Sequence, residues 1–367
     1  MAFDLLFSPI KMGSLTLPNR LVMPAMTTNL AGEDGSINDR LIDFYAIRAQ
    51  GGVGMVEVEL SIVSIEGKRL PYNIGIWHDG QIEGLAKLAR AIREAGAVAA
   101  IQIGHGGRES ISSITGYTPV APSDLPSIFR GIPSDLEKPL ALDLAGIKRL
   151  KSDFIRAARR ALEAGFQAVE IHGCHGYLIA QFLSVYANKR TDLYGGSLEN
   201  RARLLVEIIE GIKKDCGPDF PVVARINGND FVPDGNTEAD AGKIAFLAQK
   251  AGADAIHVSA GFQQSRPFRL VPAMDMVEAC HTQLAHAVKA EVDIPVIAVG
   301  KIGHPELAEE ILDQKRADLI AMGRPLICDP QFPLKARQGQ PETIRRCLWC
   351  NQGCIGQIHH LKPLVSG

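Results

Sequence analysis

Short apolar runs alternate with longer amphipathic stretches along almost the whole chain. The runs are rich in β-branched residues, whereas the longer stretches repeat their apolar residues at helical spacing. Several of the longer stretches end on glycine, the residue that commonly follows a helix C-terminus. The apolar runs span residues 20–26, 53–59, 97–104, 168–173, 220–227, 253–261, 294–300 and 317–324.

This alternation predicts an α/β fold with a parallel sheet, because runs that are apolar throughout are typical of strands covered on both faces. Helices are expected at 83–96, 152–165, 200–214 and 237–252. Eight strand–helix units favour a closed (β/α)8 barrel, the TIM barrel. The alternative is a doubly wound open sheet, which is expected to carry G-x-G-x-x-G after an early strand. No such motif follows the first run.

Three segments fall outside the repeating pattern. Residues 10–18, IKMGSLTLP, predict a β-hairpin around Gly13–Ser14 that closes the N-terminal end of the barrel. Residues 105–145 form a long irregular stretch rich in Gly, Pro and Ser, and a loop of that size is commonly functional, often a lid. The predicted organisation is a barrel over 1–345 and a short cysteine-rich C-terminal extension over 346–367.

Composition and charge exclude several classes of protein. The 367 residues are 46% hydrophobic, enough to bury a sizeable core. With 39 basic and 41 acidic side chains, the net charge of −2 predicts neither a nucleic-acid partner nor an anionic membrane surface. No apolar run reaches the roughly 18 residues of a membrane helix, and the N-terminus lacks a signal-peptide pattern. The expected location is the cytoplasm.

The C-terminal ends of barrel strands carry the active site in this architecture. The fourth run ends in His172-x-x-His175-Gly-Tyr177. Neutral imidazoles can donate N–H bonds to one carbonyl oxygen and stabilise charge that builds there, and a phenol can deliver a proton. The alternatives are metal ligation or two histidines that are merely hydrogen-bonded within a turn.

The ends of the last two strands suggest a phosphate site. Gly300 and Gly323 allow close approach of the backbone, and Arg324 can bind two phosphate oxygens at once. A phosphate commonly lies after strands seven and eight of such barrels. The alternative is that the glycines only make tight turns and Arg324 forms a surface ion pair.

Three of the seven cysteines, Cys347, Cys350 and Cys354, form C-x2-C-x3-C near the C-terminus. A reduced protein that clusters thiols commonly does so for a metal or for redox chemistry.

Several of these segments resemble one known family. The run HGCHGYLIAQFLSVYANKRTDLYGGSLENRARLLVEII is similar to the signature of the Old Yellow Enzyme family of FMN-dependent ene reductases, and PNRLVMPAMT, IQIGHGGR and MGRPLICDP match in order and spacing. The segment 345–354 resembles the region after the barrel in the 2,4-dienoyl-CoA reductase and 2-enoate reductase branch. The resemblance covers about residues 5–355 and implies a barrel with FMN at its mouth.

The resemblance also implies roles for individual residues. Thr27, within Pro24-Ala25-Met26-Thr27, would bind the flavin near its C4 carbonyl, and Gln102 would bind the pyrimidine ring. Arg225 would stabilise the negative charge of the reduced flavin. The FMN phosphate would be held by Gly300, Gly323 and Arg324.

The implied reaction transfers hydride from NADH or NADPH through flavin N5 to the β-carbon of an α,β-unsaturated carbonyl. His172 and His175 would grip the substrate carbonyl, and Tyr177 would protonate the α-carbon. Two alternatives stay open: oxidative demethylation of an N-methyl amine, and a flavin subunit that passes electrons to a partner. The expected partners are thus a small unsaturated carbonyl and either a second copy of the chain or an electron-donor subunit.

The sequence departs from the resembled branch at three places. That branch usually lacks the histidine pair, carries a histidine where this chain has Gln263, and continues into FAD and NAD(P) modules. Its iron–sulfur members have a fourth cysteine about twelve residues after the third, where this chain has Ser366. Three options follow for Cys347, Cys350 and Cys354: a cluster with a non-thiolate or distant fourth ligand, a three-ligand metal site to which His359 or His360 adds a nitrogen, or free thiols.

Overall fold

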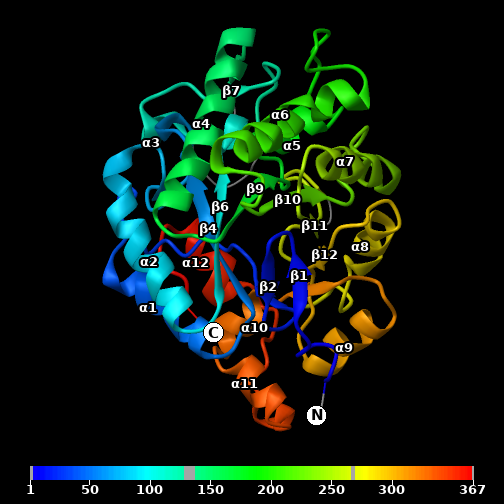
Figure 1. Cartoon of the computed structure of the whole chain (residues 1–367). Coiled ribbons are helices and arrows are strands. Elements are labelled where there is room, and N and C mark those ends of the chain that lie inside the picture. Colours follow the sequence, from blue (N-terminus) through cyan, green and yellow to red (C-terminus); the bar gives the residue numbers. More distant parts are fainter. Residues whose placement is uncertain (1–2, 128–136, 266–268, 366–367) are drawn as a thin grey trace.

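Eight parallel strands close into a barrel in the computed structural model, which describes residues 3–127, 137–265 and 269–365 (Figure 1). The barrel closes because the first strand pairs with both the second and the last. The strands are β3 (Leu21–Met23), β4 (Met55–Ile62), β6 (Val98–Gly104), β9 (Ala168–Gly173), β10 (Val222–Asn227), β11 (Ala255–Ser259), β12 (Val296–Ala298) and β13 (Leu319–Ala321). The predicted (β/α)8 barrel is confirmed. Every predicted apolar run overlaps one of its strands, although β4 continues beyond the predicted end at residue 59.

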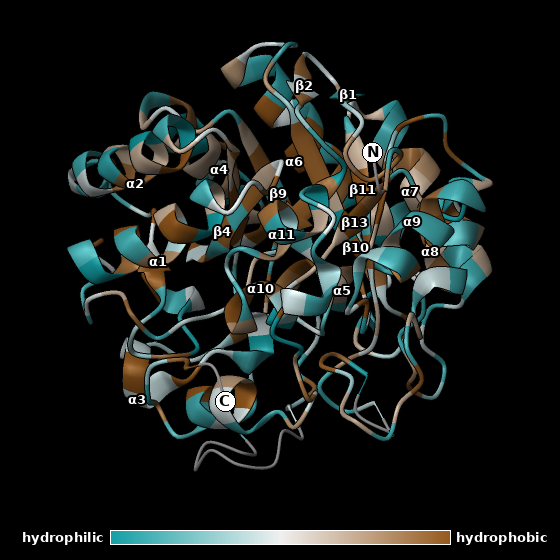
Figure 2. Ribbon diagram, turned by 90° about the horizontal axis from the view of Figure 1, so that it is seen from below, coloured by the Kyte–Doolittle hydropathy of each residue, from teal (hydrophilic) through white to brown (hydrophobic). Residues whose placement is uncertain are grey.

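Amphipathic helices surround the barrel, and Figure 2 shows their hydrophobic sides facing the brown strands at the centre. The predicted helix at 152–165 begins earlier, because Asp143 caps α4 by accepting a hydrogen bond from the Gly146 N–H at 2.7 Å. The main helices are α1 (Asp39–Gln50), α2 (Ile82–Glu94), α4 (Leu144–Glu163), α6 (Leu198–Cys216), α7 (Glu238–Lys250), α8 (Thr282–Lys289), α9 (Pro305–Asp313), α10 (Arg324–Cys328) and α11 (Phe332–Arg337).

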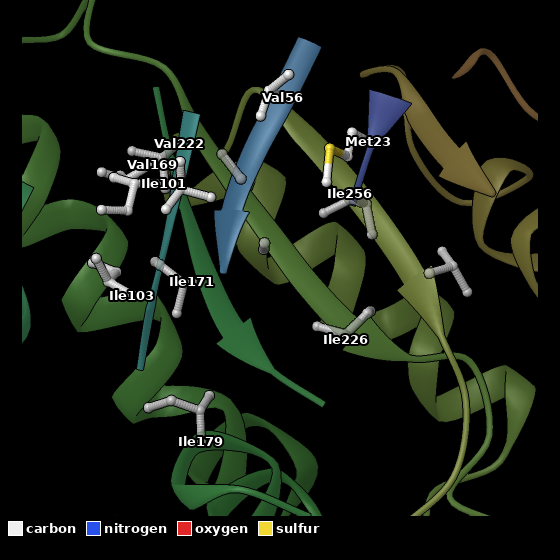
Figure 3. Packing of buried hydrophobic residues seen from close by; sticks show 14 of the residues in the cluster. Met23, Val56, Ile101, Ile103, Val169, Ile171, Ile179, Val222, Ile226 and Ile256 are labelled. Carbon is white, nitrogen blue, oxygen red and sulfur yellow. The ribbon is translucent and has the colours of Figure 1, made fainter. Parts of the chain in front are cut away.

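Side chains of each strand alternate between the helices and the barrel interior, as the two-residue period of a strand requires. Outward-facing residues such as Val56, Ile101 and Val169 join one large core with the helices (Figure 3). Inward-facing residues near the strand N-termini, such as Met55 and Val223, form a second core inside the barrel. The barrel is therefore solid at its N-terminal end.

A hairpin closes that end, as predicted. Strands β1 (Ile10–Met12) and β2 (Leu15–Leu17) pair antiparallel, and the fully buried Met12 and Leu17 pack onto the inner core. Gly13 is required at the turn because its φ is +57° and a Cβ there would lie 2.4 Å from Asp254 Oδ1.

The described part of the long stretch between β6 and α4 contains only short elements. These are η3 (Gly107–Glu109), α3 (Ser112–Thr115) and the parallel pair β7 (Val120–Ala121) and β8 (Leu140–Ala141). The predicted lid falls partly on residues 128–136, which lie outside the described residues. No helix among the described residues is long and apolar enough to cross a membrane.

The C-terminal segment folds back over the mouth of the barrel (red in Figure 1). The Leu364 N–H donates to the Thr28 carbonyl at 2.9 Å. Asn29 Nδ2 donates to the carbonyls of Ile358 and Lys362 at 3.3 and 3.2 Å. Ile358 and Leu364 are buried against Leu70. The predicted boundary at residue 345 remains a prediction, but the extension packs directly on the barrel.

Candidate active site

A cavity of about 220 Å³ lies at the C-terminal ends of the barrel strands. The C-terminal extension forms one of its walls through Trp349, Ile355, Ile358 and Leu364. The barrel residues predicted from the sequence as site residues all line this cavity: Pro24, Ala25, Met26, Thr27, Gln102, His172, His175, Tyr177, Arg225, Gly300, Gly323 and Arg324.

Strand register brings the central side chains together. In the parallel sheet, Arg225 of β10 lies level with His172 of β9 on one side and His257 of β11 on the other. All three are buried. Residues in register on neighbouring parallel strands point to the same side of the sheet. Each of these three strands therefore places a polar side chain in the barrel interior.

The rings of His172, His175 and Tyr177 lie against one another. The ring centroids of His172 and His175 are 5.2 Å apart, and those of His172 and Tyr177 are 4.7 Å apart. A left-handed turn at His175, with φ of 62°, brings its ring back toward His172. The turn is held by the His175 N–H, which donates to Asn227 Oδ1 at 3.2 Å, and by contact of its Nε2 with Ser259 Oγ at 2.6 Å.

Both histidines are neutral at physiological pH. Burial, reinforced by the positive charge of Arg225, lowers the pKa of His172 to about 3. The same two causes lower the pKa of His175 well below its ordinary value. Each ring therefore keeps one N–H donor and one acceptor nitrogen, which is the form suited to binding a carbonyl oxygen.

Arg69 is a site residue that the sequence reasoning missed. Its Nη1 donates to Tyr177 Oη at 2.9 Å, and its guanidinium lies 5.9 Å from the centre of the Tyr177 ring. Because the phenol oxygen accepts this bond, its own proton is left to be donated elsewhere. Arg69 follows β4 on a loop, and no motif in the sequence links it to Tyr177.

A buried acidic network lies beneath the cavity. Glu170 accepts from Gln102 Nε2 at 2.5 Å, and its other oxygen lies 2.6 Å from His257 Nδ1. Glu57 Oε2 is 3.4 Å from the same His257 nitrogen. Burial, reinforced by Glu170, raises the pKa of Glu57 to about 7. Burial also tends to raise the pKa of Glu170, but His257 and Arg225 hold it at about 2. The charged carboxylate of Glu170 thus fixes the carboxamide of Gln102.

Two glycines shape the other end of the cavity. A Cβ at Gly323 would lie 2.5 Å from Met26 Sδ, and one at Gly300, whose φ is +124°, would lie 2.8 Å from the His281 ring. A side chain at either glycine would therefore clash with a neighbouring residue. The approach of Gly300 and Gly323 to a phosphate remains a prediction.

Among the described residues, Arg324 forms no ion pair with an acidic side chain, and it is largely buried rather than on the surface. Its Nη1 donates to the Pro272 carbonyl at 2.6 Å and to Asn351 Oδ1 at 2.8 Å, and its guanidinium lies 4.5 Å from the centre of the Trp349 ring. Arg324 therefore joins the cavity to the cysteine segment. Its contact with a phosphate remains a prediction.

Two buried nitrogens on the cavity wall, Arg225 Nε and His281 Nε2, have no hydrogen-bond partner among the described residues. Burial, then Arg269 and Arg324, lowers the pKa of His281 to about 4, so the ring is neutral. Because an unsatisfied buried polar group costs about 1–3 kcal/mol, such groups on a cavity wall indicate a bound partner. His281 was also missed, since it lies before α8 without a recognisable motif.

Two groups of described side chains near the cavity could ligate a metal, and one of them is the buried network of Glu57, Glu170 and His257. His172, Cys174 and His175 bring ligand atoms within 4.8 Å of one another. However, burial raises the pKa of the Cys174 thiol far above its ordinary value, which keeps the thiol protonated and disfavours a metal there. Of the predicted cysteine ligands, Cys354 lines the cavity, while Cys347 and Cys350 lie behind it.

Comparison with known proteins gives a consistent result. Residues 5–343 match the profile of the NADH:flavin oxidoreductase / NADH oxidase family. An NADH oxidase of Thermoanaerobacter brockii is 43% identical over 356 residues, which cover 96% of this chain and 54% of that protein. An NADPH dehydrogenase of Bacillus cytotoxicus is 38% identical over 333 residues, covering 90% of this chain and 91% of that protein.

Among solved structures, a complex of 2-naphthoyl-CoA reductase with 2-naphthoyl-CoA superposes with a TM-score of 0.93 at 32% identity. The match covers 99% of this chain and 56% of the reductase. The chain thus spans about half the length of this reductase and of the NADH oxidase. With a family profile matched over nearly the whole barrel, the chain belongs to the NADH:flavin oxidoreductase / NADH oxidase family, the family of Old Yellow Enzyme.

Proposed function

We propose that this protein is an FMN-dependent ene reductase that uses NADH or NADPH to reduce the C=C bond of an α,β-unsaturated carbonyl. The observation that carries the proposal is the group formed by His172, His175 and Tyr177: two neutral imidazoles and a phenol, ring against ring, on the wall of the cavity. Such a group can hold one carbonyl oxygen and donate a proton beside it.

The residues present fit the FMN that the family implies. Arg225 Nε, a donor, and His281 Nε2, which donates or accepts according to the tautomer of the neutral ring, lack partners within the described structure. An anionic cofactor with ring carbonyls and a phosphate supplies an acceptor for Arg225 Nε, and for His281 Nε2 in the tautomer that donates. Thr27, Gln102 and Arg225 would hold the ring system. The phosphate would be held by Gly300, Gly323 and Arg324. When bound, FMN supplies a two-electron carrier between the nicotinamide and the alkene.

The protein's own groups perform the remaining tasks. His172 and His175 orient the substrate by donating to its carbonyl oxygen, and their low pKa values keep them as neutral donors. Arg69 holds the Tyr177 oxygen as acceptor, so the phenolic O–H is directed to the substrate α-carbon. The proton leaves Tyr177 as the carbon accepts it, and solvent restores it afterwards.

The charge of the cavity wall argues against amine oxidation. Arg69, Arg225, Lys301 and Arg324 line the cavity, whereas none of the described lining residues is Asp or Glu. A substrate cation would be repelled here, because like charges at low dielectric cost several kcal/mol or more. A neutral carbonyl whose oxygen gains negative charge is favoured by the same residues.

The test is anaerobic turnover of cyclohexenone by the purified chain with NADH or NADPH. We expect saturated ketone to form in proportion to the nicotinamide consumed. If NAD(P)H bleaches the flavin absorbance but cyclohexenone does not restore it, the chain is instead a subunit that passes electrons to a partner. Bleaching by an N-methylated amine without nicotinamide would identify an amine dehydrogenase.

A further inference from the structure

Each of the two cavity histidines has one ring nitrogen in contact with a further polar side chain. His172 Nδ1 lies 3.3 Å from Cys174 Sγ, and His175 Nε2 lies 2.6 Å from Ser259 Oγ. A neutral imidazole has one N–H and one bare nitrogen, and the hydrogen bond made by one nitrogen decides which of the two carries the proton. These two contacts therefore bear on what each ring offers to a ligand.

The backbone at the end of β9 places Cys174 beside His172. The two residues are two positions apart, and side chains at that spacing in an extended chain point the same way. In the turn that follows, the Tyr177 N–H donates to the Cys174 carbonyl at 3.3 Å, and Gly176 is left-handed with φ of 82°. The Cys174 side chain is fully buried. Among the described residues, the ring of His172 is the hydrogen-bond partner of its sulfur.

The thiol is the donor in this pair. Burial raises the pKa of the Cys174 thiol far above its ordinary value, although Arg225 acts in the opposite direction, so the sulfur keeps its proton. Sulfur is a weak acceptor, whereas the bare nitrogen of a neutral imidazole is free to accept. In the opposite arrangement, with the His172 Nδ1–H directed at sulfur, the buried S–H would have no acceptor among the described residues. The S–H therefore points at His172 Nδ1.

The ring proton of His172 consequently lies on Nε2. Within the described structure this nitrogen has no hydrogen-bond partner, yet it is not among the fully buried nitrogens. Because His172 lines the cavity, its Nε2 faces the open space there. The ring thus offers an N–H, rather than a lone pair, at the place where a carbonyl oxygen would bind.

Ser259 does not determine the tautomer of His175 in the same way. A hydroxyl both donates and accepts hydrogen bonds, so the contact between Ser259 Oγ and His175 Nε2 is compatible with either tautomer of that ring. A thiol is more selective because its sulfur accepts weakly. The histidine pair therefore contains one ring with a fixed tautomer, His172, and one ring that can adapt to the ligand, His175.

We propose that Cys174 is a positioning residue that fixes His172 as the Nε2–H tautomer and so presents an N–H donor to the carbonyl oxygen of the substrate. Cys174 is not among the described residues that line the cavity, so it acts through the ring of His172. The thiol keeps its proton throughout, and no covalent bond forms or breaks. The inference rests on the proposed function for the identity of the ligand, whereas the tautomer is a property of the protein without substrate.

The test measures the tautomer of His172 in the FMN-loaded protein. Long-range ¹H–¹⁵N correlation spectra of protein labelled with ¹⁵N-histidine separate the two tautomers, because bare and protonated ring nitrogens differ in chemical shift. His172→Gln assigns the signal. Cys174→Ala removes the donor, and Cys174→Ser keeps one in the form of a hydroxyl. Cys216→Ala, which removes a thiol at the end of α6, is the matched control. Bound FMN per chain reports on correct folding, and titration with a phenol measures binding at the histidine pair.

We expect the Nε2–H tautomer of His172 in the wild type, in Cys216→Ala and in Cys174→Ser, with equal phenol affinity in all three. In Cys174→Ala both tautomers should be populated, and the dissociation constant for the phenol should rise by about 2- to 10-fold, the effect of one ordinary hydrogen bond. Bound FMN should be unchanged in every variant.

An Nδ1–H tautomer in the wild type would overturn the proposal. So would a Cys174→Ala spectrum identical to that of the wild type, or an equal loss of phenol affinity in Cys174→Ser, which would indicate a role in packing alone. A wild type that shows the Nε2–H tautomer but does not reduce cyclohexenone would contradict the ene reductase function and leave the assignment of the tautomer supported.

Discussion

The two ends of the barrel are built from the same eight strands but have opposite character. At the N-terminal end the inward side chains are apolar, and Met12 and Leu17 of the hairpin pack tightly on them. At the C-terminal end the inward side chains are polar, and they surround a cavity of about 220 Å³. The change from an apolar to a polar inward side chain takes only two residues along one strand, from Val223 to Arg225.

Along the barrel axis, the residues that stabilise the fold are therefore separated from the residues that could bind ligands or react. The closed end is dominated by the hydrophobic effect and contains few groups that could react. The open end contains donors without partners, neutral histidines and a buried carboxylate pair, which are costly for stability and useful for binding. Substitutions at the two ends should therefore have effects of different kinds.

The largest effect is expected for Tyr177→Phe at the open end. Loss of a general acid typically slows a reaction 10²–10⁴-fold, so alkene reduction should slow by about that factor. Reduction of the flavin by NAD(P)H should stay nearly unchanged, because the phenol is not needed for it. Stopped-flow absorbance separates the two half-reactions. Tyr186→Phe is the control, since its ring packs on Phe262 outside the cavity. An unchanged alkene step would show that Tyr177 is not the proton donor.

At the closed end, Leu17→Ala should lower the free energy of unfolding by about 2–5 kcal/mol, the usual cost of truncating a fully buried leucine. Binding of ligands at the open end should not change. The measurement is urea unfolding together with FMN content, with the exposed Thr16→Ala on the same strand as control. Loss of FMN without loss of stability would mean that the two ends are not separate.

His172→Ala should weaken the binding of phenols, which mimic an enolate oxygen. Removing a hydrogen bond to a charged group costs about 1.5–3 kcal/mol, so the dissociation constant should rise by about 10- to 150-fold. Titration of the long-wavelength charge-transfer band of the flavin–phenol complex measures it. His286→Ala, exposed on α8, serves as the control. An unchanged affinity would exclude His172 from the oxyanion site.

The smallest effect is expected for Glu57→Gln, between the two ends. The pKa of Glu57 is raised from 4.5 to about 7, so the folded protein holds this proton more tightly than the unfolded chain does. Stability should therefore be highest below about pH 4.5 and fall as the pH rises toward 7. One pKa unit corresponds to about 1.4 kcal/mol, and His257 shares the charge. Glu57→Gln should therefore reduce the loss of unfolding free energy between pH 5 and pH 8 by on the order of 1–2 kcal/mol.

The measurement is urea unfolding at both pH values, with the exposed Glu210→Gln on α6 as control. Because Glu59 is buried and its pKa is also raised to about 7, part of the pH dependence should remain in the variant. A pH dependence identical to that of the wild type would show that Glu57 is not ionised on going from pH 5 to pH 8.

The sequence by itself determined the barrel, its hairpin and the central polar residues of the cavity wall. These depend on local signals: runs that are apolar throughout, helical spacing between them, a hairpin turn at Gly13, and polar residues at strand ends. In a parallel barrel all strand C-termini meet at one face. Gln102, His172 and Arg225 could therefore be assigned to one site without knowledge of any contact between them.

Only the tertiary structure decided which distant segments complete the site. Arg69 meets Tyr177 across 108 positions of the chain, and the Leu364 N–H reaches the Thr28 carbonyl at the opposite end of the sequence. Cys328 faces the cysteines of the extension only because that segment turns back past α10. Such contacts have no period or motif, since they depend on where the closed barrel places its loops and on the apolar surface that the returning segment buries there.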